Sequence, residues 1–452
     1  MDTLPALTLE VAPTDGIFAP GVHTGLSLLR AEVPLWRPVK GGNIRSVELT
    51  DNPHTLTAWR RERKQARKLR SFNSTVELAS QLAVVEDISF HRTFSAVGER
   101  WFLNGAGGER LWTRYWREQR KLNDDVQPRS AFERHFRDSQ HLKRPLPVWD
   151  GPVSGLPYVL DARNLFNYYH FMAETFCHLA LLAELPEFDG NIFIHCPDRA
   201  PKAFILNFIE ALFPQFASRV LFPGTRQHYA RALTPFVPNF YLFQAPEEET
   251  RGLREAAPTS DHWDLSLPTG PVKRTLRQNG YPRSLRLLRE QALDAAKAVD
   301  VSHLPKRFWF GRKSEGMRDR SIPAEAAIIE GLKTRGFGVI CFEDLTPLEQ
   351  IAAMHQAECA ISYHGAGFTN LIYANPNAQI IELGTLQSGM LRWTDFISLA
   401  HVSGCTYTLG ICDGDVPIET ARPNLRGPLH RIRISDAGRD LLMAHIDKLF
   451  PA

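Results

Sequence analysis

The residues best suited to chemistry lie in two separate stretches of the chain. In the first, Asn167, His170 and Glu174 have the spacing i, i+3 and i+7, which places their side chains on one face of a helix. A histidine beside a carboxylate near a helix start can act as an acid/base pair whose basicity is set by burial and by its neighbour. The simpler alternative, favoured for isolated residues, is a polar helix start capped by Asn167.

The second stretch is a turn of small residues between a predicted strand and a predicted helix. Gly365, Ala366 and Gly367 allow a bulky group to approach the backbone, and the amides at the start of the next helix attract an anion to that spot. His364 and Asn370 add side-chain donors at the rim. This geometry suits a diphosphate, although such turns often serve only to pack a helix on a strand.

A basic loop and a further carboxylate are predicted to lie at the same sheet edge as this turn. Residues 312–320 include four cations, among them Arg312 and Arg320, directly after a predicted strand. At the carboxyl end of a parallel sheet, guanidinium groups neutralise phosphate charge. Glu382 lies at the end of the next strand, where a carboxylate can accept hydrogen bonds from ribose hydroxyls. A basic loop alone indicates only a solvated segment, but together the three features favour a nucleotide diphosphate.

The elements that must position these residues follow an α/β pattern. From residue 157 onward, short apolar runs alternate with helix-length amphipathic segments, which predicts parallel sheets with crossover helices. We place one α/β unit at residues 151–304 and a second at 305–452, with a helix at its end. Predicted strands cover 158–160, 192–195, 220–222, 307–310, 337–342, 360–362 and 379–383, and predicted helices cover 167–185, 201–213, 284–299, 347–357 and 369–374.

Residues 1–150 are predicted to be a partly β-structured extension, with strands near 7–11, 26–33 and 44–49. They include two basic stretches, Thr57–Phe72 with helix-favouring composition and Leu111–Lys121. One interpretation is a patch for anionic lipid or a charged polysaccharide. A solvated helix face is the simpler interpretation and the preferred one.

The composition of the chain excludes several classes of protein. The chain has 452 residues, 43% hydrophobic and 23% charged, which is typical of a globular protein and excludes disorder as its main state. With 53 basic and 50 acidic residues, it is too balanced for a dedicated nucleic-acid binder. The sequence has no apolar run of transmembrane length and no visible secretory signal. A cytoplasmic location is the expectation.

The motifs together resemble glycosyltransferase family 61. Asn167-Tyr168-Tyr169-His170 with Glu174 resembles that family's upstream element N-x-x-H-x-x-x-D/E. The remaining matches are Arg312 through Arg320, Glu325, Glu343-Asp344-Leu345, Glu349-Gln350, Ala357, His364 through Asn370, and Ile381-Glu382. They cover about residues 157–385 in the family's order. Ala324 and Phe368 depart from the pattern, where Asn and Leu are commoner, and neither change disrupts the donor-site motif.

The resemblance implies a GT-B-like architecture, with two Rossmann-like domains facing a cleft. It also implies an inverting hexosyl- or pentosyltransferase (EC 2.4) that uses a nucleotide-sugar donor without an obligatory metal or other cofactor. The acceptor would be a glycan or lipid-linked glycan in surface polysaccharide biosynthesis, such as capsule. Arg312, Arg320, the small-residue turn and Glu382 would hold the donor. Glu174 is the first choice for the base and His170 the second.

The expected location is the cytoplasm. Peripheral contact with the inner membrane, through the basic segments, is an open alternative. One rival is a non-catalytic glycan-binding or assembly protein with the same fold. Another is a dinucleotide oxidoreductase, which lacks support because no G-x-G-x-x-G follows an early strand. Asp413-Gly414-Asp415 has the D-x-D spacing of metal-dependent sugar transferases, but it lies late in the chain and carries little weight.

Overall fold

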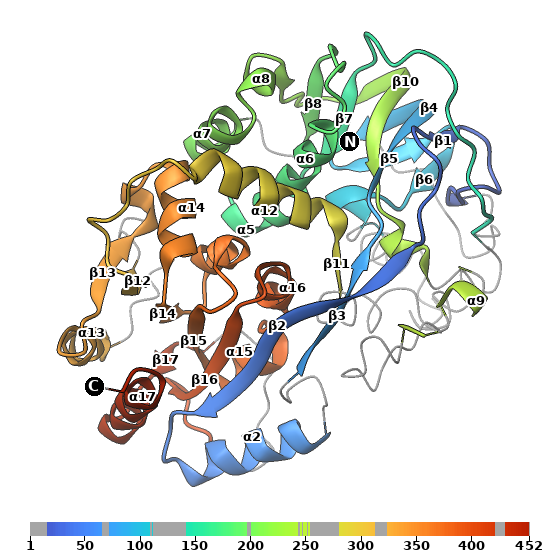
Figure 1. Ribbon diagram of the computed structural model, residues 1–452. Coiled ribbons are helices and arrows are strands. Elements are labelled where there is room, and N and C mark those ends of the chain that lie inside the picture. Colours follow the sequence, from blue (N-terminus) through green and yellow to red (C-terminus); the bar gives the residue numbers. More distant parts are fainter. Residues whose placement is uncertain are drawn as a thin grey trace.

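The computed structural model describes residues 16–65, 72–108, 111, 142–196, 200–242, 245, 247–250, 252–253, 280–311, 323–420 and 430–451. These residues form a mixed α/β protein with two multi-stranded sheets (Figure 1). The predicted α/β class is therefore confirmed.

The first sheet has the strand order β6-β5-β4-β10-β7-β8-β9, and β1 pairs with β4. Its strands are β1 (Leu26–Leu28), β4 (Gln81–His91), β5 (Phe94–Val97), β6 (Arg100–Phe102), β7 (Tyr158–Asp161), β8 (Ile192–His195), β9 (Val220–Leu221) and β10 (Gln227–Phe236). Strands β10, β7, β8 and β9 pair in parallel, whereas β4 is antiparallel to both β10 and β5. The predicted parallel unit is therefore extended by an antiparallel half from earlier in the chain.

The second sheet has the order β11-β3-β2-β16-β15-β14-β12-β13, and β17 pairs with β16. Its strands are β2 (Trp36–Glu48), β3 (Phe72–Leu78), β11 (Gly280–Pro282), β12 (Arg307–Gly311), β13 (Gly338–Cys341), β14 (Cys359–Tyr363), β15 (Gln379–Thr385), β16 (Thr406–Gly414) and β17 (Ile432–Arg433). Strands β13, β12, β14, β15 and β16 pair in parallel. Their carboxyl ends therefore lie at one edge, as the sequence predicts for β12, β14 and β15.

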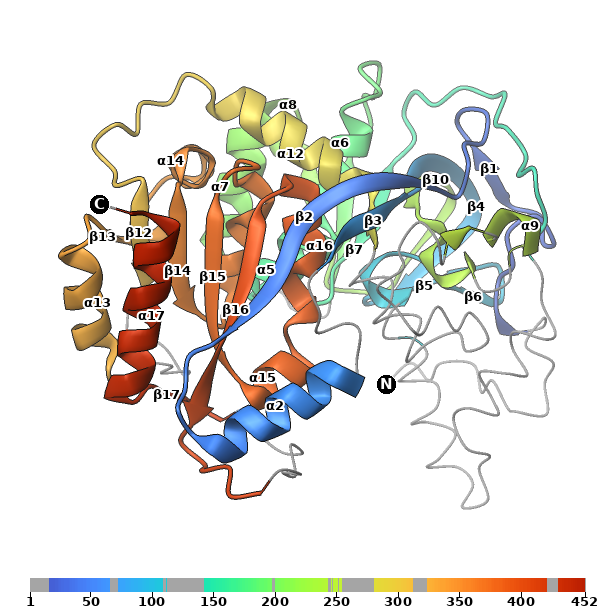
Figure 2. The same ribbon diagram turned by 60° about the horizontal axis from the view of Figure 1, so that its bottom comes forward.

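Strands from the first hundred residues complete both sheets (Figure 2). Strand β2 pairs in parallel with β16, and β4 pairs with β10 along nine residue pairs. Strand β2 is longer than the strand predicted near 44–49, and no strand was predicted at β4. Each pairs with a strand more than a hundred residues later in the chain, which local sequence patterns do not reveal. The predicted division at residues 150 and 304 stays a prediction.

The helices mostly follow the predicted pattern. They are α2 (Pro53–Gln65), α5 (Tyr168–Glu174), η2 (Phe176–His178), α6 (Leu179–Leu182), α7 (Ala203–Leu212), α8 (Pro214–Ala217), η3 (Pro238–Phe240), α9 (Glu247–Thr250), α12 (Arg283–Ala296), α13 (Glu325–Lys333), η5 (Phe342–Asp344), α14 (Pro347–Gln356), η6 (Ala366–Tyr373), α15 (Leu386–Leu391), α16 (Thr394–Ser403) and α17 (Asp436–Leu449). At α14, Thr346 and Glu349 form a capping box, with Pro347 at the first helical position.

The prediction of a single helix over residues 167–185 is wrong, because the helix is interrupted at Thr175. Helix α5 ends at Glu174, and Thr175 has non-helical backbone angles, φ −129° and ψ −58°. The buried hydroxyl of Thr175 donates to the carbonyl oxygen of Asp161 at 2.8 Å. This bond fixes Thr175 against the end of β7 and separates α5 from the helical turns that follow.

The basic stretch predicted as a helix to Phe72 is helical over α2, and Phe72 instead begins β3. Ala58 and Trp59 of α2 are buried, and Arg60 forms an exposed ion pair with Glu48. The predicted strand near 7–11 and the stretch Leu111–Lys121, apart from Leu111, lie outside the described residues. No helix in the described ranges has the length and apolar character needed to cross a membrane.

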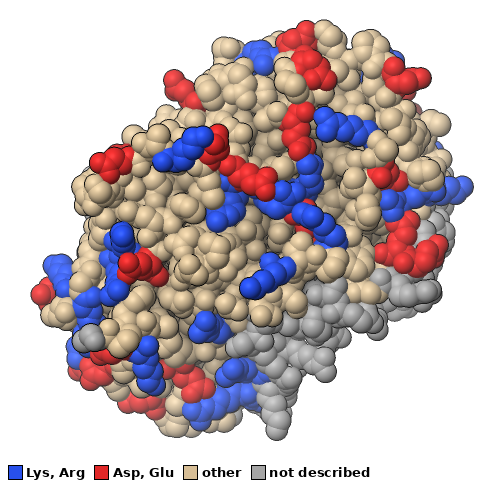
Figure 3. All heavy atoms as spheres, viewed as in Figure 1, with Lys and Arg blue, Asp and Glu red and all other residues tan. Residues whose placement is uncertain are grey.

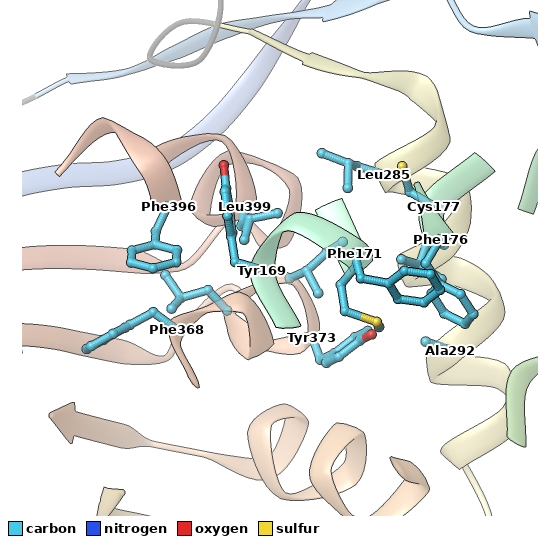
Figure 4. Close-up of a cluster of buried hydrophobic side chains, with 14 of the residues drawn as sticks. Tyr169, Phe171, Phe176, Cys177, Leu285, Ala292, Phe368, Tyr373, Phe396 and Leu399 are labelled. Carbon is cyan, nitrogen blue, oxygen red and sulfur yellow. The ribbon is translucent and has the colours of Figure 1, made fainter. Parts of the chain in front are cut away.

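One apolar core continues from the helices beside the first sheet to those beside the second. Figure 4 shows part of it, with Phe171 and Phe176 near Leu285 and Ala292 of α12. On its other side, Tyr169 lies near Phe396. Because this core is shared, α5 is buried between the two sheet units.

Helix α12 is tied to both units by polar contacts. Arg283 pairs with Glu184 at 2.5 Å, Arg286 pairs with the buried Glu77 of β3 at 2.6 Å, and Arg289 donates to the carbonyl oxygen of Ile372 in η6 at 2.8 Å. Figure 3 shows acidic and basic side chains interspersed on this face of the molecule, with a run of both signs where Figure 1 places α12 and β11.

Candidate active site

The loop from β7 to α5 is held by two asparagines. Asn164 Oδ1 accepts hydrogen bonds from the backbone amides of Phe166 and Asn167. Asn167 then caps α5, because its side chain accepts from the backbone N–H of His170 at 3.2 Å. The predicted cap is therefore present, and it fixes the helix start at the carboxyl end of a parallel strand.

The His170–Glu174 pair lies on this helix as the spacing predicts. His170 Nδ1 is 3.1 Å from Glu174 Oε1, and Glu174 Oε2 is 3.2 Å from Arg163 Nε. The side chains of His170 and Glu174 are 22% and 11% exposed. Arg163 was not predicted as a site residue, although its position two residues after the end of β7 could have indicated one.

The neighbours of His170 favour one tautomer of its neutral imidazole ring. Arg163 Nη1 lies 3.5 Å from His170 Nε2, and a guanidinium can only donate. Nε2 of the neutral ring therefore carries the lone pair, while Nδ1 carries the hydrogen that is donated to Glu174. This is the arrangement of a histidine general base oriented by a carboxylate.

A second histidine–carboxylate pair lies at the edge of the other sheet. His364 follows β14, and its Nδ1 is 2.8 Å from Glu382 Oε1 on the neighbouring strand β15. The hydroxyl of Tyr407, on β16, donates to Glu382 Oε2. Burial, reinforced by the charge of Glu382, holds the pKa of Tyr407 well above its usual range, so this phenol remains a donor at neutral pH.

Glu382 is completely buried behind His364. Both of its oxygens are bonded, one to His364 and one to Tyr407. A ribose hydroxyl can reach this carboxylate only if Glu382 becomes exposed and gives up one of these bonds, so the placement does not support the predicted ribose contact. It fits a carboxylate that orients His364.

The small-residue turn leads into a 3₁₀ helix. Helix η6 begins at Ala366, with Gly365 as its N-cap, earlier than the helix predicted from residue 369. A Cβ at Gly367 would lie 3.2 Å from the ring of Phe310 on β12, so a side chain there would press on the strand beneath. Gly367 therefore has the packing role that was the simpler alternative, and its predicted donor contact stays a prediction.

Asn370 is buried, with 1% of its surface exposed. Its Oδ1 accepts from the hydroxyl of Tyr168 at 2.6 Å, and its Nδ2 donates to Gln350 Oε1 at 3.4 Å. Both ends of the amide are therefore bonded within the protein, which leaves the predicted role as a donor at the rim without support.

An aromatic contact joins the two histidine pairs. The ring of Phe396, on α16, lies 5.3 Å from Tyr169 and 5.4 Å from His364 between centroids. Tyr169 directly precedes His170 in α5, and Figure 4 shows its ring on the same side as Phe396 and Phe368. The histidines of the two pairs are 194 positions apart in sequence, and these contacts bring the pairs into one region of the molecule.

Arg312 and Arg320 lie outside the described residues. Strand β12 ends at Gly311 and pairs in parallel with β14, which leads to His364. The basic loop therefore begins at the same sheet edge as the small-residue turn.

The D-x-D segment has structural partners. Asp413 accepts hydrogen bonds from the hydroxyls of Thr50 and Thr55, and Asp415 accepts from the backbone amide of Arg431. Among the residues that the structure describes, no group of three or more His, Cys, Asp or Glu side chains is arranged to hold a metal ion.

Asp161, at the end of β7, is a buried carboxyl that the sequence did not reveal. Its side chain accepts from the backbone amides of Gly107 and Ala106. Burial raises its pKa to about 7, against the lowering effect of these amides, and the charge of Glu174 adds to the rise. Its signal, an acid at the carboxyl end of an apolar strand, was present in the sequence.

The fold and the two histidine–carboxylate pairs define an α/β protein with a polar site built from the carboxyl ends of parallel strands. Residues 168–381 match the family model described as Glycosyltransferase 61, as the resemblance of the motifs predicts. The matched region contains His170, Glu174 and the His364 turn. No curated protein matches the chain. This match supports a glycosyltransferase role, and a protein of that family would use a sugar donor and an acceptor.

Proposed function

We propose that the protein is an inverting glycosyltransferase that moves a sugar from a nucleotide-sugar donor to a glycan or lipid-linked glycan acceptor. The observation that carries this proposal is a chain of ring contacts, through Tyr169 and Phe396, that links the two histidine–carboxylate pairs of different sheet units. One pair suits proton removal from the acceptor, and the other suits contact with the donor. In a GT-B-like arrangement, donor and acceptor would meet between the two sheet units.

His170 is the base in this proposal, with Glu174 orienting it. Glu174 was the first choice from sequence, but its Oε1 contacts His170 and its Oε2 contacts Arg163. His170 is the more exposed of the two, and its Nε2 lone pair becomes available when the acceptor hydroxyl displaces the 3.5 Å contact from Arg163 Nη1. The acceptor hydroxyl gives its proton to Nε2 as its oxygen bonds to the anomeric carbon, and the bond from that carbon to the diphosphate oxygen breaks with its electron pair.

The departing diphosphate gains negative charge, and cations and amides stabilise it. Arg312, Arg320 and His364 would supply positive charge or hydrogen bonds, and the amides of the Gly365–Gly367 turn would supply further donors. Glu382 would act through His364 by fixing its orientation. We also propose that this stabilisation requires no obligatory metal.

The proposed setting is surface polysaccharide biosynthesis, such as capsule formation, in the cytoplasm. As an alternative to a purely cytoplasmic location, the proposal includes peripheral contact with the inner membrane through the basic segments. In the described part of the first segment, Trp59 is buried in the core while Arg60 forms an exposed pair with Glu48, the pattern of an amphipathic helix with one solvated face.

A thermal-shift panel tests the donor class. The wild-type protein is screened with UDP, GDP, CMP, their common sugar conjugates and NAD, first with a chelator and then with magnesium or manganese. A ligand that binds the folded state raises the melting temperature. We expect a shift with one nucleotide in the chelator, and a shift with NAD alone would contradict the proposal.

The stereochemistry of the product tests the mechanism. NMR of the anomeric proton, with the donor identified by the panel and candidate glycan acceptors, should show inversion relative to the donor. Retention of configuration would contradict the single-displacement mechanism. Binding of the donor and of glycans without transfer or hydrolysis would instead support the non-catalytic alternative.

A further inference from the structure

A hydrogen bond joins α5, which carries the candidate base, to η6, which follows the candidate donor turn. It runs from the hydroxyl of Tyr168 to Oδ1 of Asn370, with a length of 2.6 Å. We propose that Tyr168 and Asn370 are positioning residues that hold His170 at its working distance from the His364 turn. This inference rests on the proposed function and gives Asn370 a role other than direct donor contact.

The Tyr168 side of the bond is rigidly placed. Tyr168 is the first residue of α5, two positions before His170. Its ring contacts Phe204 and Phe208 of α7 at centroid distances of 5.5 and 5.6 Å. Burial raises the pKa of its hydroxyl well above the usual range, so the phenol remains protonated and available as a donor.

The Asn370 side is equally constrained. The amide nitrogen of Asn370 donates to Gln350 Oε1, and Gln350 Nε2 donates to the carbonyl oxygen of Leu345 at 3.1 Å. This relay connects η6 to α14 and fixes which end of the Asn370 amide faces Tyr168. The oxygen of Asn370 is thus presented to α5 by the second sheet unit.

The consequence for catalysis follows from the shortness of α5. The helix has seven residues and ends at the break at Thr175, so a shift at Tyr168 is carried to His170 within one turn. A general base must lie within hydrogen-bond reach of the acceptor hydroxyl. A displacement of about 1 Å can lower a rate by about 100-fold.

Tyr168→Phe is the test, with Tyr373→Phe as its matched control. Tyr373 lies in η6 and is fully buried, and its hydroxyl has no hydrogen-bond partner among the residues that the structure describes. Both substitutions remove one buried hydroxyl from the same region, but only the first breaks the bond between α5 and η6. Kinetics with each UDP-, GDP- and CMP-sugar of the panel, together with thermal unfolding, provide the measurements.

We expect Tyr168→Phe to lower kcat by about 10- to 100-fold, with KM for the nucleotide sugar within about twofold of wild type, since the donor turn is intact. Tyr373→Phe should keep the wild-type kcat. In the double variant Tyr168→Phe/Asn370→Leu, apolar groups replace both partners of this bond, but Gln350 Oε1 also loses its donor, so the melting temperature should recover only in part while kcat stays low.

Equal kcat values for Tyr168→Phe and Tyr373→Phe would overturn the positioning role, and so would recovery of kcat together with stability in the double variant. An inactive wild-type protein would contradict the proposed function and this role with it. An active wild type with an equally active Tyr168→Phe variant would contradict the positioning role alone.

Discussion

The two histidine–carboxylate pairs use the same residue types in different surroundings. His170 and Glu174 are one helical turn apart on a short helix, partly exposed and next to Arg163. His364 and Glu382 come from neighbouring strands, and Glu382 is fully buried with its second oxygen bonded to Tyr407. The side chains of the first pair are 22% and 11% exposed, against 14% and 0% for the second. The first pair is therefore the more accessible to a substrate, whereas the second fixes a histidine in one orientation.

Two pairs of the same residue types can therefore have different roles, one as a base and one as a structural support, and the exposure of the side chains distinguishes them. A carboxylate with both oxygens bonded inside the protein acts through the histidine that it holds. A histidine whose lone pair lies at the surface of a site can itself take a proton. The predictions below test this difference, beginning with the largest effect.

Replacing His170 by Gln should lower turnover by about 100- to 10,000-fold, because the general base is removed. The thermal shift caused by the donor nucleotide should persist, because the donor turn is unchanged. Glu174→Gln should cost less, since its amide oxygen can still accept the Nδ1 hydrogen of His170. Steady-state kinetics with the identified donor provide the measurement.

His228→Gln is the control for the first prediction, because His228 and Asp87 form another histidine–carboxylate pair, 2.7 Å apart and exposed. It should leave turnover unchanged. If Glu174→Gln were more harmful to turnover than His170→Gln, the base would be Glu174 and the comparison would be reversed.

Asp161 makes the first-sheet edge sensitive to pH. Its pKa of about 7 in the folded protein lies above the value near 4 of an unfolded chain. A raised pKa means that its contribution to stability is complete below pH 4 and is lost as the pH rises to 7, by about 1.4 kcal/mol per pH unit. Asp161→Asn should remove this slope, measured by urea unfolding at pH 5 and 7.5.

Asp189→Asn is the control for this slope. Hydrogen bonds from Gly155 and Ser154 lower the pKa of Asp189, so it is ionised throughout this range. The buried His178 and His195 act in the opposite direction, because burial lowers their pKa values to about 4 and about 3. Their contribution is present above pH 6.5 and lost as the pH falls. An unchanged slope in Asp161→Asn would exclude Asp161 as its source.

Tyr407→Phe should reduce the free energy of unfolding by about 1–3 kcal/mol, because it leaves Glu382 Oε2 buried without its hydroxyl donor. Tyr373→Phe should have little effect, because the Tyr373 hydroxyl bonds to none of the described residues. Urea unfolding of the two variants measures the difference. Equal stabilities would show that the bond to Glu382 contributes nothing, and the second pair would then lack its proposed support.

The smallest effects concern the helix caps. Asn167→Ala and Thr346→Ala should each reduce the free energy of unfolding by about 1 kcal/mol, because each removes a side-chain N-cap. Only Asn167→Ala should also lower turnover, since α5 carries His170 and α14 carries no proposed catalytic group. Parallel measurements of unfolding and kcat compare them. Equal kcat values would mean that the α5 cap does not affect His170.

Local patterns predicted much of the second unit. The buried β14, the turn after it and the capping box of α14 depend on residues that are neighbours in sequence. The Asn167 cap and the His170–Glu174 pair were predictable for the same reason, since one helical turn sets their spacing. The break at Thr175 was not, because its bond to Asp161 joins two elements.

Local sequence patterns were enough to predict the α/β class, the resemblance to glycosyltransferase family 61, and the residue types of both histidine pairs. Only the tertiary structure decided that β2 and β4 complete different sheets, that Glu382 is buried behind His364, and that Tyr168 meets Asn370. Helical spacing is a local property that a single chain encodes directly. Strand pairing, burial and the exposure that separates a base from its support depend on contacts between distant segments, which form only when the apolar surfaces of both units are buried together.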